Sequence, residues 1–259
     1  MLDSINFANL PAFLLILVRV TSFFVTLPLF SYQTVPTRHK VAFSFFLASI
    51  MYFTVPTPEL VIDAEYFLLL FKEAAVGIAV GLLAYIILSA IQIAGGFIDF
   101  QMGFAIANVI DPQTGAQSPL IGQYLYIITL LFILAVDGHH LMIDGVFYSY
   151  ELVGIDQFIP FRDEGWIEYV IHSFNKMFII AFLMATPIVG CLFLVDIALG
   201  IIARTVPQLN VFVVGLPLKI FVALSLLVIA MTFYVMLIQN LFETMLETMR
   251  GLMQLFGGG

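Results

Sequence analysis

Charged residues are scarce in this chain, and this scarcity excludes an ordinary soluble domain. Only 10% of the 259 residues are Asp, Glu, Lys or Arg, whereas a typical soluble domain has about 25%. So few charges do not cover the surface of a water-soluble globule. The net charge of −8 also argues against nucleic acid as a partner.

The sequence has a single cysteine and lacks the common catalytic motifs. Cys191 lies inside an apolar run, so it provides neither a disulfide framework nor a cysteine-rich metal cluster. No GxSxG, P-loop or HExxH motif is found anywhere along the chain. We therefore expect no enzymatic activity and no bound cofactor.

Hydrophobic residues dominate instead, at 62% of the chain, with a mean hydropathy of +1.11. A helix needs about 20 mostly apolar residues to cross a bilayer. The sequence predicts an all-α membrane protein with about six hydrophobic segments, at residues 10–30, 41–55, 66–97, 120–136, 177–203 and 211–238. Pro207 and Pro217 bracket a short polar stretch, which predicts a hairpin bend between the last two segments.

Two further stretches differ from these segments. Residues 137–176 form the one long polar insertion, which we expect to be a solvated connector with a short helix. Over residues 241–256, apolar groups alternate with Glu243, Glu247 and Arg250. This spacing predicts an amphipathic helix that lies on the membrane or docks on a partner.

Ionisable side chains inside the apolar segments need partners. Each costs about 2.5–3.5 kcal/mol at bilayer depth on insertion scales. The candidates for intramembrane or intersubunit charges are Arg19, Lys72, Glu73, Asp99, Asp196 and Lys219. Two interpretations stay open. One is a path for a substrate or ion, and the other is that these charges pair with charges on neighbouring helices or lie outside the hydrocarbon. Lys72 and Glu73 are adjacent and point in different directions on a helix, so we expect each to find its partner elsewhere.

Small residues mark expected sites of close helix packing. Gly77 and Gly81 form a GxxxG pattern, which lets two helices approach closely. Gly95 and Gly96 begin an apolar run that is also able to pack tightly.

Adjacent histidines follow a short turn at His139 and His140, with Asp144 nearby. Neighbouring residues on a helix diverge by roughly 100°. We therefore interpret this pair as polar groups at a helix end and expect no metal site.

A polar segment with almost no charge separates the third and fourth apolar segments. It contains Asn108, Asp111-Pro112, Gly115 and Ser118-Pro119, which are residues that favour turns. Two interpretations remain open here, a loop that folds inward to occupy a lumen and an ordinary surface loop.

Several features, in their order along essentially the whole chain, carry a resemblance to one protein family. They are the Arg19 segment leading to Pro28, the turn from Pro36 to Lys40, Lys72-Glu73 followed by Gly77 and Gly81, the run from Gly96 to Gly103, Asp111-Pro112 with Gly115 and Ser118-Pro119, and Asp137-Gly138-His139-His140. On these residues the chain resembles the FliR/SctT family of type III secretion export-gate proteins.

The resemblance implies one membrane-embedded domain, residues 1–259, built of helical hairpins. Residues 1–176 would correspond to a P-type gate subunit with a pore-facing loop. Residues 177–259 would correspond to a Q-type hairpin followed by the amphipathic helix. The implied pore plug comprises Ile106, Asn108, Asp111, Pro112, Gly115, Gln117 and Ser118.

The resemblance also implies partners and a location. The partners are P-type and Q-type gate proteins in a hetero-oligomer, B-type and A-type export apparatus proteins, unfolded flagellar substrates and lipid. The implied location is the bacterial inner membrane, multi-pass, within the flagellar basal body. The residues alone leave two rival functions open, a secondary transporter that uses charges such as Asp99 and a membrane scaffold without a pathway.

Overall fold

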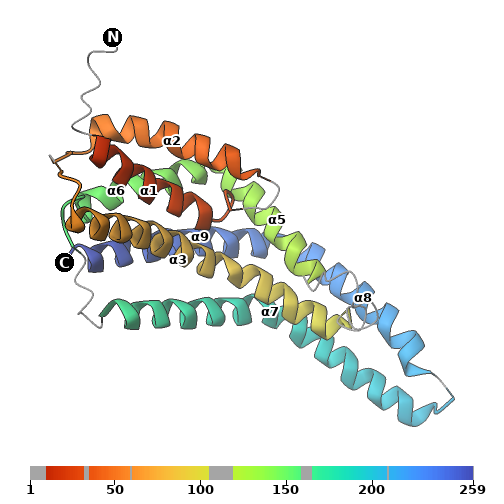
Figure 1. The fold of residues 1–259 in the computed structure, drawn as a ribbon. Coiled ribbons are helices and arrows are strands. Elements are labelled where there is room, and N and C mark those ends of the chain that lie inside the picture. Colours follow the sequence, from red (N-terminus) through yellow and green to blue (C-terminus); the bar gives the residue numbers. More distant parts are fainter. Residues whose placement is uncertain are drawn as a thin grey trace. The chain divides into compact units, whose positions relative to one another are not determined.

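The computed structural model describes residues 10–31, 35–58, 60–104, 119–158, 165–208 and 210–258. Within these ranges every regular element is an α-helix (Figure 1). The helices are α1 (Leu10–Thr26), α2 (Thr37–Thr54), α3 (Ala64–Met102), α5 (Leu120–Ala135), α6 (Gly138–Leu152), α7 (Gly165–Thr205), α8 (Val211–Ile229) and α9 (Met231–Phe256). The expected all-α class is confirmed for this part of the chain.

Three of these helices, α3, α7 and α8, are long and apolar enough to cross a membrane, and a fourth span results if α5 and α6 are taken together as one bent span. The expected number of about six long helices is not confirmed. Helix α1 has only 17 residues. The first turn of α2 contains Arg38, His39 and Lys40, which lower its hydropathy.

The turn between the last two segments ends earlier in the sequence than we expected from Pro207 and Pro217. Helix α7 ends at Thr205 and α8 begins at Val211, so Pro207 lies in the turn, but Pro217 lies inside α8. Asn210 caps α8, because its side-chain oxygen accepts hydrogen bonds from the N–H groups of Phe212 and Val213 at 3.1 and 3.4 Å. Pro217 removes one backbone donor without ending the helix.

The chain divides into two compact units, each described here by itself. The first comprises Met1–Ile87, Val136–Phe174 and Glu243–Gly259, and the second comprises Leu88–Ala135 and Asn175–Phe242. Helices α3, α7 and α9 therefore each contribute to both units.

The core of the first unit includes the stretch that we expected to be a solvated connector. Met142, Val146 and Tyr150 of α6 are buried, as are Val153 and Ile155 beyond its end. The expectation was wrong because hydropathy averaged over residues 137–176 conceals one apolar face of a short helix.

The C-terminal half of α9 is amphipathic, and its apolar face is buried within the chain. Met245, Met249, Leu252 and Met253 are each at most 1% exposed. A Cβ atom built on Gly145 of α6 would lie 3.3 Å from the Met249 side chain, so α6 and α9 are in contact. This face consequently does not lie on a membrane or on another protein, contrary to the expectation.

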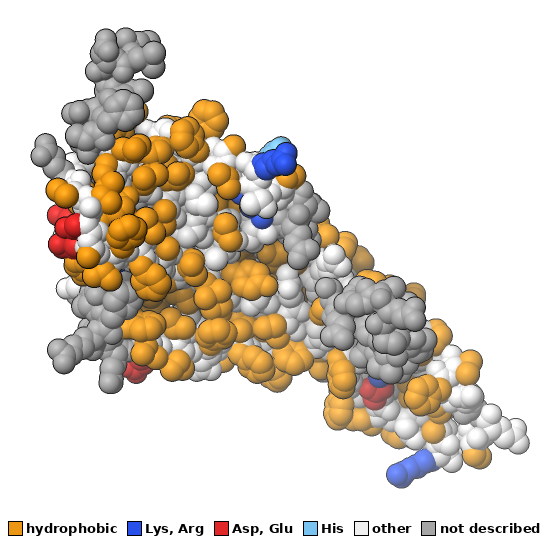
Figure 2. Space-filling model, viewed as in Figure 1, with side chains coloured by type: hydrophobic (Ala, Val, Ile, Leu, Met, Phe, Trp, Pro, Cys, Tyr) orange, Lys and Arg blue, Asp and Glu red, His pale blue; other side chains and the backbone are white. Residues whose placement is uncertain are grey.

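The second unit leaves much apolar surface uncovered. In α8 only Gly215, Ala223 and Leu227 are buried, whereas Phe212 and Val228 are each 77% exposed. Figure 2 shows hydrophobic side chains over much of the face in view. Exposed apolar surface on this scale is typical of a protein covered by lipid or by partner subunits.

Candidate functional site

A cluster of three buried charges joins α1 to α3 in the first unit. Arg19 of α1 donates from Nε and Nη2 to the two carboxylate oxygens of Glu73 on α3, the second bond measuring 2.8 Å. The Nζ atom of Lys72 lies 2.5 Å from Glu73 Oε1. All three residues are at most 1% exposed. As expected, Glu73 finds a partner elsewhere, in Arg19. Lys72 and Glu73 also pair with each other, contrary to the expectation, because the flexible lysine stem bends back toward its neighbour.

The two cations of this cluster also bind the C-terminal end of α6. Arg19 Nη1 donates to the Ser149 carbonyl at 3.1 Å, and Nη2 donates to the Val153 carbonyl at 3.0 Å. Lys72 Nζ donates to the carbonyls of Gly154 and Ile155 at 2.8 and 3.0 Å. Carbonyl groups at a helix C-terminus carry partial negative charge. This charge compensates the second cation of the cluster, because Arg19 and Lys72 share the single anion Glu73.

Tyr150 completes the cluster. Its ring centroid lies 3.7 Å from the Arg19 guanidinium carbon, and its hydroxyl donates to Glu73 Oε2 at 3.2 Å. Sequence reasoning missed Tyr150 and Ser149, since nothing in the pattern of α6 marks them as partners of residues about 130 positions earlier. The cluster is sealed from solvent, and its evident role is to hold α1, α3 and α6 together.

Gly77 and Gly81 lie on the face of α3 that packs against α1. A Cβ atom on Gly77 would overlap the Ser22 hydroxyl and the Arg19 carbonyl, and one on Gly81 would overlap the Thr26 hydroxyl. Only a residue without a side chain fits at either position.

In the second unit, a buried carboxylate joins α3 to the beginning of α5. Asp99 is 5% exposed, and its Oδ2 atom accepts a hydrogen bond from the Ile121 N–H at 3.0 Å. The backbone N–H groups of Leu120 and Gly122 face the same carboxyl group. The carboxylate therefore lies at the positive end of α5.

Gly95 of α3 makes this approach possible, and Gly96 lies beside it within ordinary contact distance of Pro119, just before α5. A Cβ atom on Gly95 would overlap backbone atoms of Gly122, and one on Gly96 would lie 3.4 Å from the Pro119 ring. The two helices are thus in backbone contact beside Asp99.

A second, more exposed ion pair links α7 to α8. Lys219 Nζ lies 2.6 Å from Asp196 Oδ1, with side-chain exposures of 19% and 38%. Gln101 of α3 donates to the other oxygen of Asp196 at 2.9 Å. These groups border a groove of about 320 Å³ that is otherwise mostly apolar. A partly exposed pair of this kind contributes roughly 0–1 kcal/mol.

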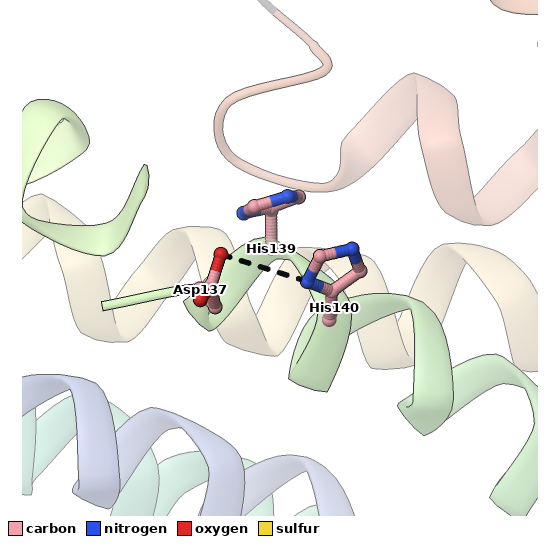
Figure 3. Close-up of side chains that lie close together, drawn as sticks. All are labelled: Asp137, His139 and His140. Carbon is pink, nitrogen blue, oxygen red and sulfur yellow. Dashed lines mark ion pairs between the residues drawn. The ribbon is translucent and has the colours of Figure 1, made fainter. Parts of the chain in front are cut away.

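The two histidines at the beginning of α6 lie beside Asp137 (Figure 3). The possible ligand atoms of Asp137, His139 and His140 lie within 4.8 Å of one another. The imidazole centroids are 4.1 Å apart and the ring planes differ by only 35°. Asp144 is not part of this cluster. The interpretation of the two histidines as polar groups at a helix end stays a prediction.

The remaining site residues lie outside the residues that the structure describes. They are the members of the expected plug, Ile106, Asn108, Asp111, Pro112, Gly115, Gln117 and Ser118. The described backbone ends at Phe104 and resumes at Pro119.

The chain is similar to one protein family and to several known proteins. The model of a family described as bacterial export proteins, family 1, matches residues 10–245. The flagellar biosynthetic protein FliR of Bacillus subtilis (strain 168) is 57% identical over 249 residues, which cover 95% of this chain and 96% of that protein. The Yop proteins translocation protein T of Yersinia pestis is 34% identical over 221 residues, covering 83% of this chain and 84% of that protein. FliR of Escherichia coli (strain K12) is 25% identical over 228 residues, 88% of this chain and 87% of that protein.

Proposed function

Because the chain belongs to family 1 of the bacterial export proteins, we propose that it is a core component of the flagellar type III protein export gate. In this role it forms part of the channel through which unfolded flagellar subunits are exported. The observation that carries the proposal is the 57% identity to a flagellar FliR protein over 95% of the chain. The similarity to a Yop translocation protein extends the same role to a related secretion system.

The proposed role is that of a structural subunit without catalysis. It needs neither a cofactor nor a nucleotide, since the channel wall only has to enclose the substrate. Energy for export comes from other parts of the apparatus. The sealed Arg19 cluster supports this role, because it fixes three segments of a channel wall and leaves no polar atom of the cluster open to a substrate.

The proposed assembly is a hetero-oligomer in the bacterial inner membrane, at the flagellar basal body. Residues 1–176 act as the P-like portion and residues 177–259 as the Q-like hairpin with its C-terminal helix. P-type and Q-type subunits cover the apolar surface of α7 and α8, where Phe182 and Phe221 are 59% and 70% exposed. The B-type and A-type apparatus proteins associate with the assembled gate.

The proposed plug is the polar, nearly uncharged segment that contains Asn108, Asp111 and Ser118. A plug with one charge leaves the pore without a large desolvation cost, because neutral polar groups are far cheaper to move than ions. Apolar side chains then seal around the passing chain.

Deleting residues 108–118 tests this function against its two rivals. The gate function predicts ion leak across the membrane, with export partly kept or deregulated. A secondary transporter would lose uptake without leak, and a scaffold would show neither effect. The assay combines membrane conductance and export of a flagellar substrate in cells whose own gate subunit is replaced by this chain.

Copurification provides the matched measurement of assembly. We expect the intact chain and the deletion variant to copurify equally with P-type and Q-type proteins, because α7 and α8 are unchanged. Failure of the intact chain both to restore export and to copurify with these proteins would overturn the proposed function.

A further inference from the structure

Helix α2 has an apolar face that the first unit leaves uncovered. Its opposite face packs against α1, where the rings of Phe24 and Phe43 lie 5.1 Å apart between centroids. On the outer face, Phe46, Ile50 and Phe53 are 69%, 57% and 85% exposed. These positions are four and three residues apart, so they form one apolar stripe along the helix.

A shallow groove of about 530 Å³ lies at the beginning of α2. It is lined by Thr37, Arg38, Val41, Ala42, Phe45 and Phe46. Among these six residues only Arg38 is charged, and it lies at one end of the set. From Arg38 to Phe46 the helix rises about 12 Å, which is close to the roughly 15 Å of hydrocarbon in one leaflet of a bilayer.

Positive charge is confined to this end of α2. The first turn contains Arg38, His39 and Lys40 and no acidic residue, and residues 41–54 carry no charged side chain. Figure 2 shows basic side chains grouped at the end where α2 begins, next to hydrophobic ones. None of the ion pairs among the described residues includes Arg38 or Lys40. The cations of α2 are therefore open to an external anion.

An anionic phospholipid has the charge distribution that complements this surface. Its headgroup carries the negative charge at one end, and its acyl chains are apolar over the depth of one leaflet. Lys and Arg near a membrane surface attract such lipids. A protein partner would need an acidic group level with Arg38 and an apolar stripe beside Phe45 and Phe46, whereas every anionic phospholipid has both features.

We propose that the groove at the beginning of α2 binds an anionic phospholipid, with the phosphate at Arg38 and one acyl chain along Val41, Phe45 and Phe46. Lys40 lies two residues further on and hence on a different side of the helix, so it adds attraction only at longer range. The inference goes beyond the proposed function, because it requires only that the chain lie in a membrane.

The test is a titration of the purified full chain in neutral detergent with phosphatidylglycerol or phosphatidylcholine, followed by native mass spectrometry. We expect the wild type to bind the anionic lipid about tenfold more tightly. Arg38→Gln should weaken phosphatidylglycerol binding about fivefold, the usual effect of one basic residue near an anionic lipid, and Arg38→Lys should keep most of it. Arg204→Gln, the matched control, removes another exposed arginine at a helix end and leaves binding unchanged.

A second pair of variants tests the apolar part of the groove. Phe46→Ala should weaken binding of both lipids roughly threefold, because it removes apolar surface that an acyl chain covers. Phe53→Ala, on the same stripe but not among the residues that line the groove, should leave binding unchanged.

The proposal is overturned if the wild type binds the two lipids equally, or if Arg204→Gln weakens binding as much as Arg38→Gln. The same titration of the chain copurified with P-type and Q-type proteins separates a lipid from a protein occupant. Binding that still depends on Arg38 supports the lipid, whereas loss of binding on assembly shows that a subunit covers α2 and overturns the proposal.

Failure of the proposed function gives a different result. In that case the wild-type chain does not restore export, whereas the titration of the chain alone still shows whether Arg38 binds an anionic lipid.

Discussion

Replacing Glu73 by glutamine is expected to destabilise the first unit by roughly 3–5 kcal/mol, the usual cost of removing one partner from a buried ion pair. Glu73 is the one anion among Arg19, Lys72 and Glu73, and its side chain is fully buried. The wild-type cluster has two cations and one anion, a net charge of +1, and the variant has +2. Glutamine keeps the shape but offers one acceptor oxygen where the carboxylate accepts from Arg19, Lys72 and Tyr150.

Removing Lys72 has a smaller expected effect. Lys72→Met leaves Arg19 and Glu73 as a neutral pair, and the loss is mainly that of two carbonyl contacts, at Gly154 and Ile155. This variant leaves no unpaired buried charge, unlike Glu73→Gln, and the methionine stem retains the packing. The order of stability is therefore wild type, then Lys72→Met, then Glu73→Gln.

The assay is reversible unfolding of the purified chain in detergent, followed by circular dichroism. Glu65→Gln is the matched control, because Glu65 lies on the same helix, is exposed, and undergoes the same change of side chain. We expect this control to change stability by less than about 0.5 kcal/mol. A loss below about 1 kcal/mol for Glu73→Gln would refute the reasoning, since the cluster would then be solvated or dispensable.

Two further predictions concern packing within the same chain. Gly77→Leu should destabilise the contact between α1 and α3 by more than about 2 kcal/mol, because the larger side chain overpacks it. Its control, Gly200→Ala, has open space around it and should be neutral or slightly stabilising. Thermal unfolding in detergent measures both effects. Met249→Ala, at a position that is 1% exposed, should lower the free energy of unfolding by about 2–5 kcal/mol. Met236→Ala, at a position that is 59% exposed, should lower it far less when both are measured by denaturant titration. Equal losses would contradict the buried placement of the C-terminal half of α9.

Hydropathy was sufficient to predict the apolar class and the long helices, because α3, α7 and α8 are apolar over at least 18 consecutive residues. It failed for α6, whose polar residues conceal a buried face formed by Met142, Val146 and Tyr150. Burial in this helix depends on packing against other segments, and a window average contains no information about those contacts.

In the candidate site, likewise, part of the arrangement was predictable from the sequence and part was not. Arg19, Lys72 and Glu73 were identifiable because charges in apolar segments are costly. Their mutual pairing was not, since it depends on how α1, α3 and α6 meet in space. The role of Asp99 at α5 was equally inaccessible, because the bond joins residues 22 positions apart across a segment with no regular pattern.

The Arg19 cluster also constrains the order of events during biosynthesis. Ser149 and Val153 follow Arg19 by 130 and 134 residues, so the guanidinium leaves the ribosome long before those acceptors exist. Its anionic partner Glu73 follows after 54 residues and is available to pair with it first. The cluster as a whole is therefore completed only after more than half of the polypeptide has been synthesised.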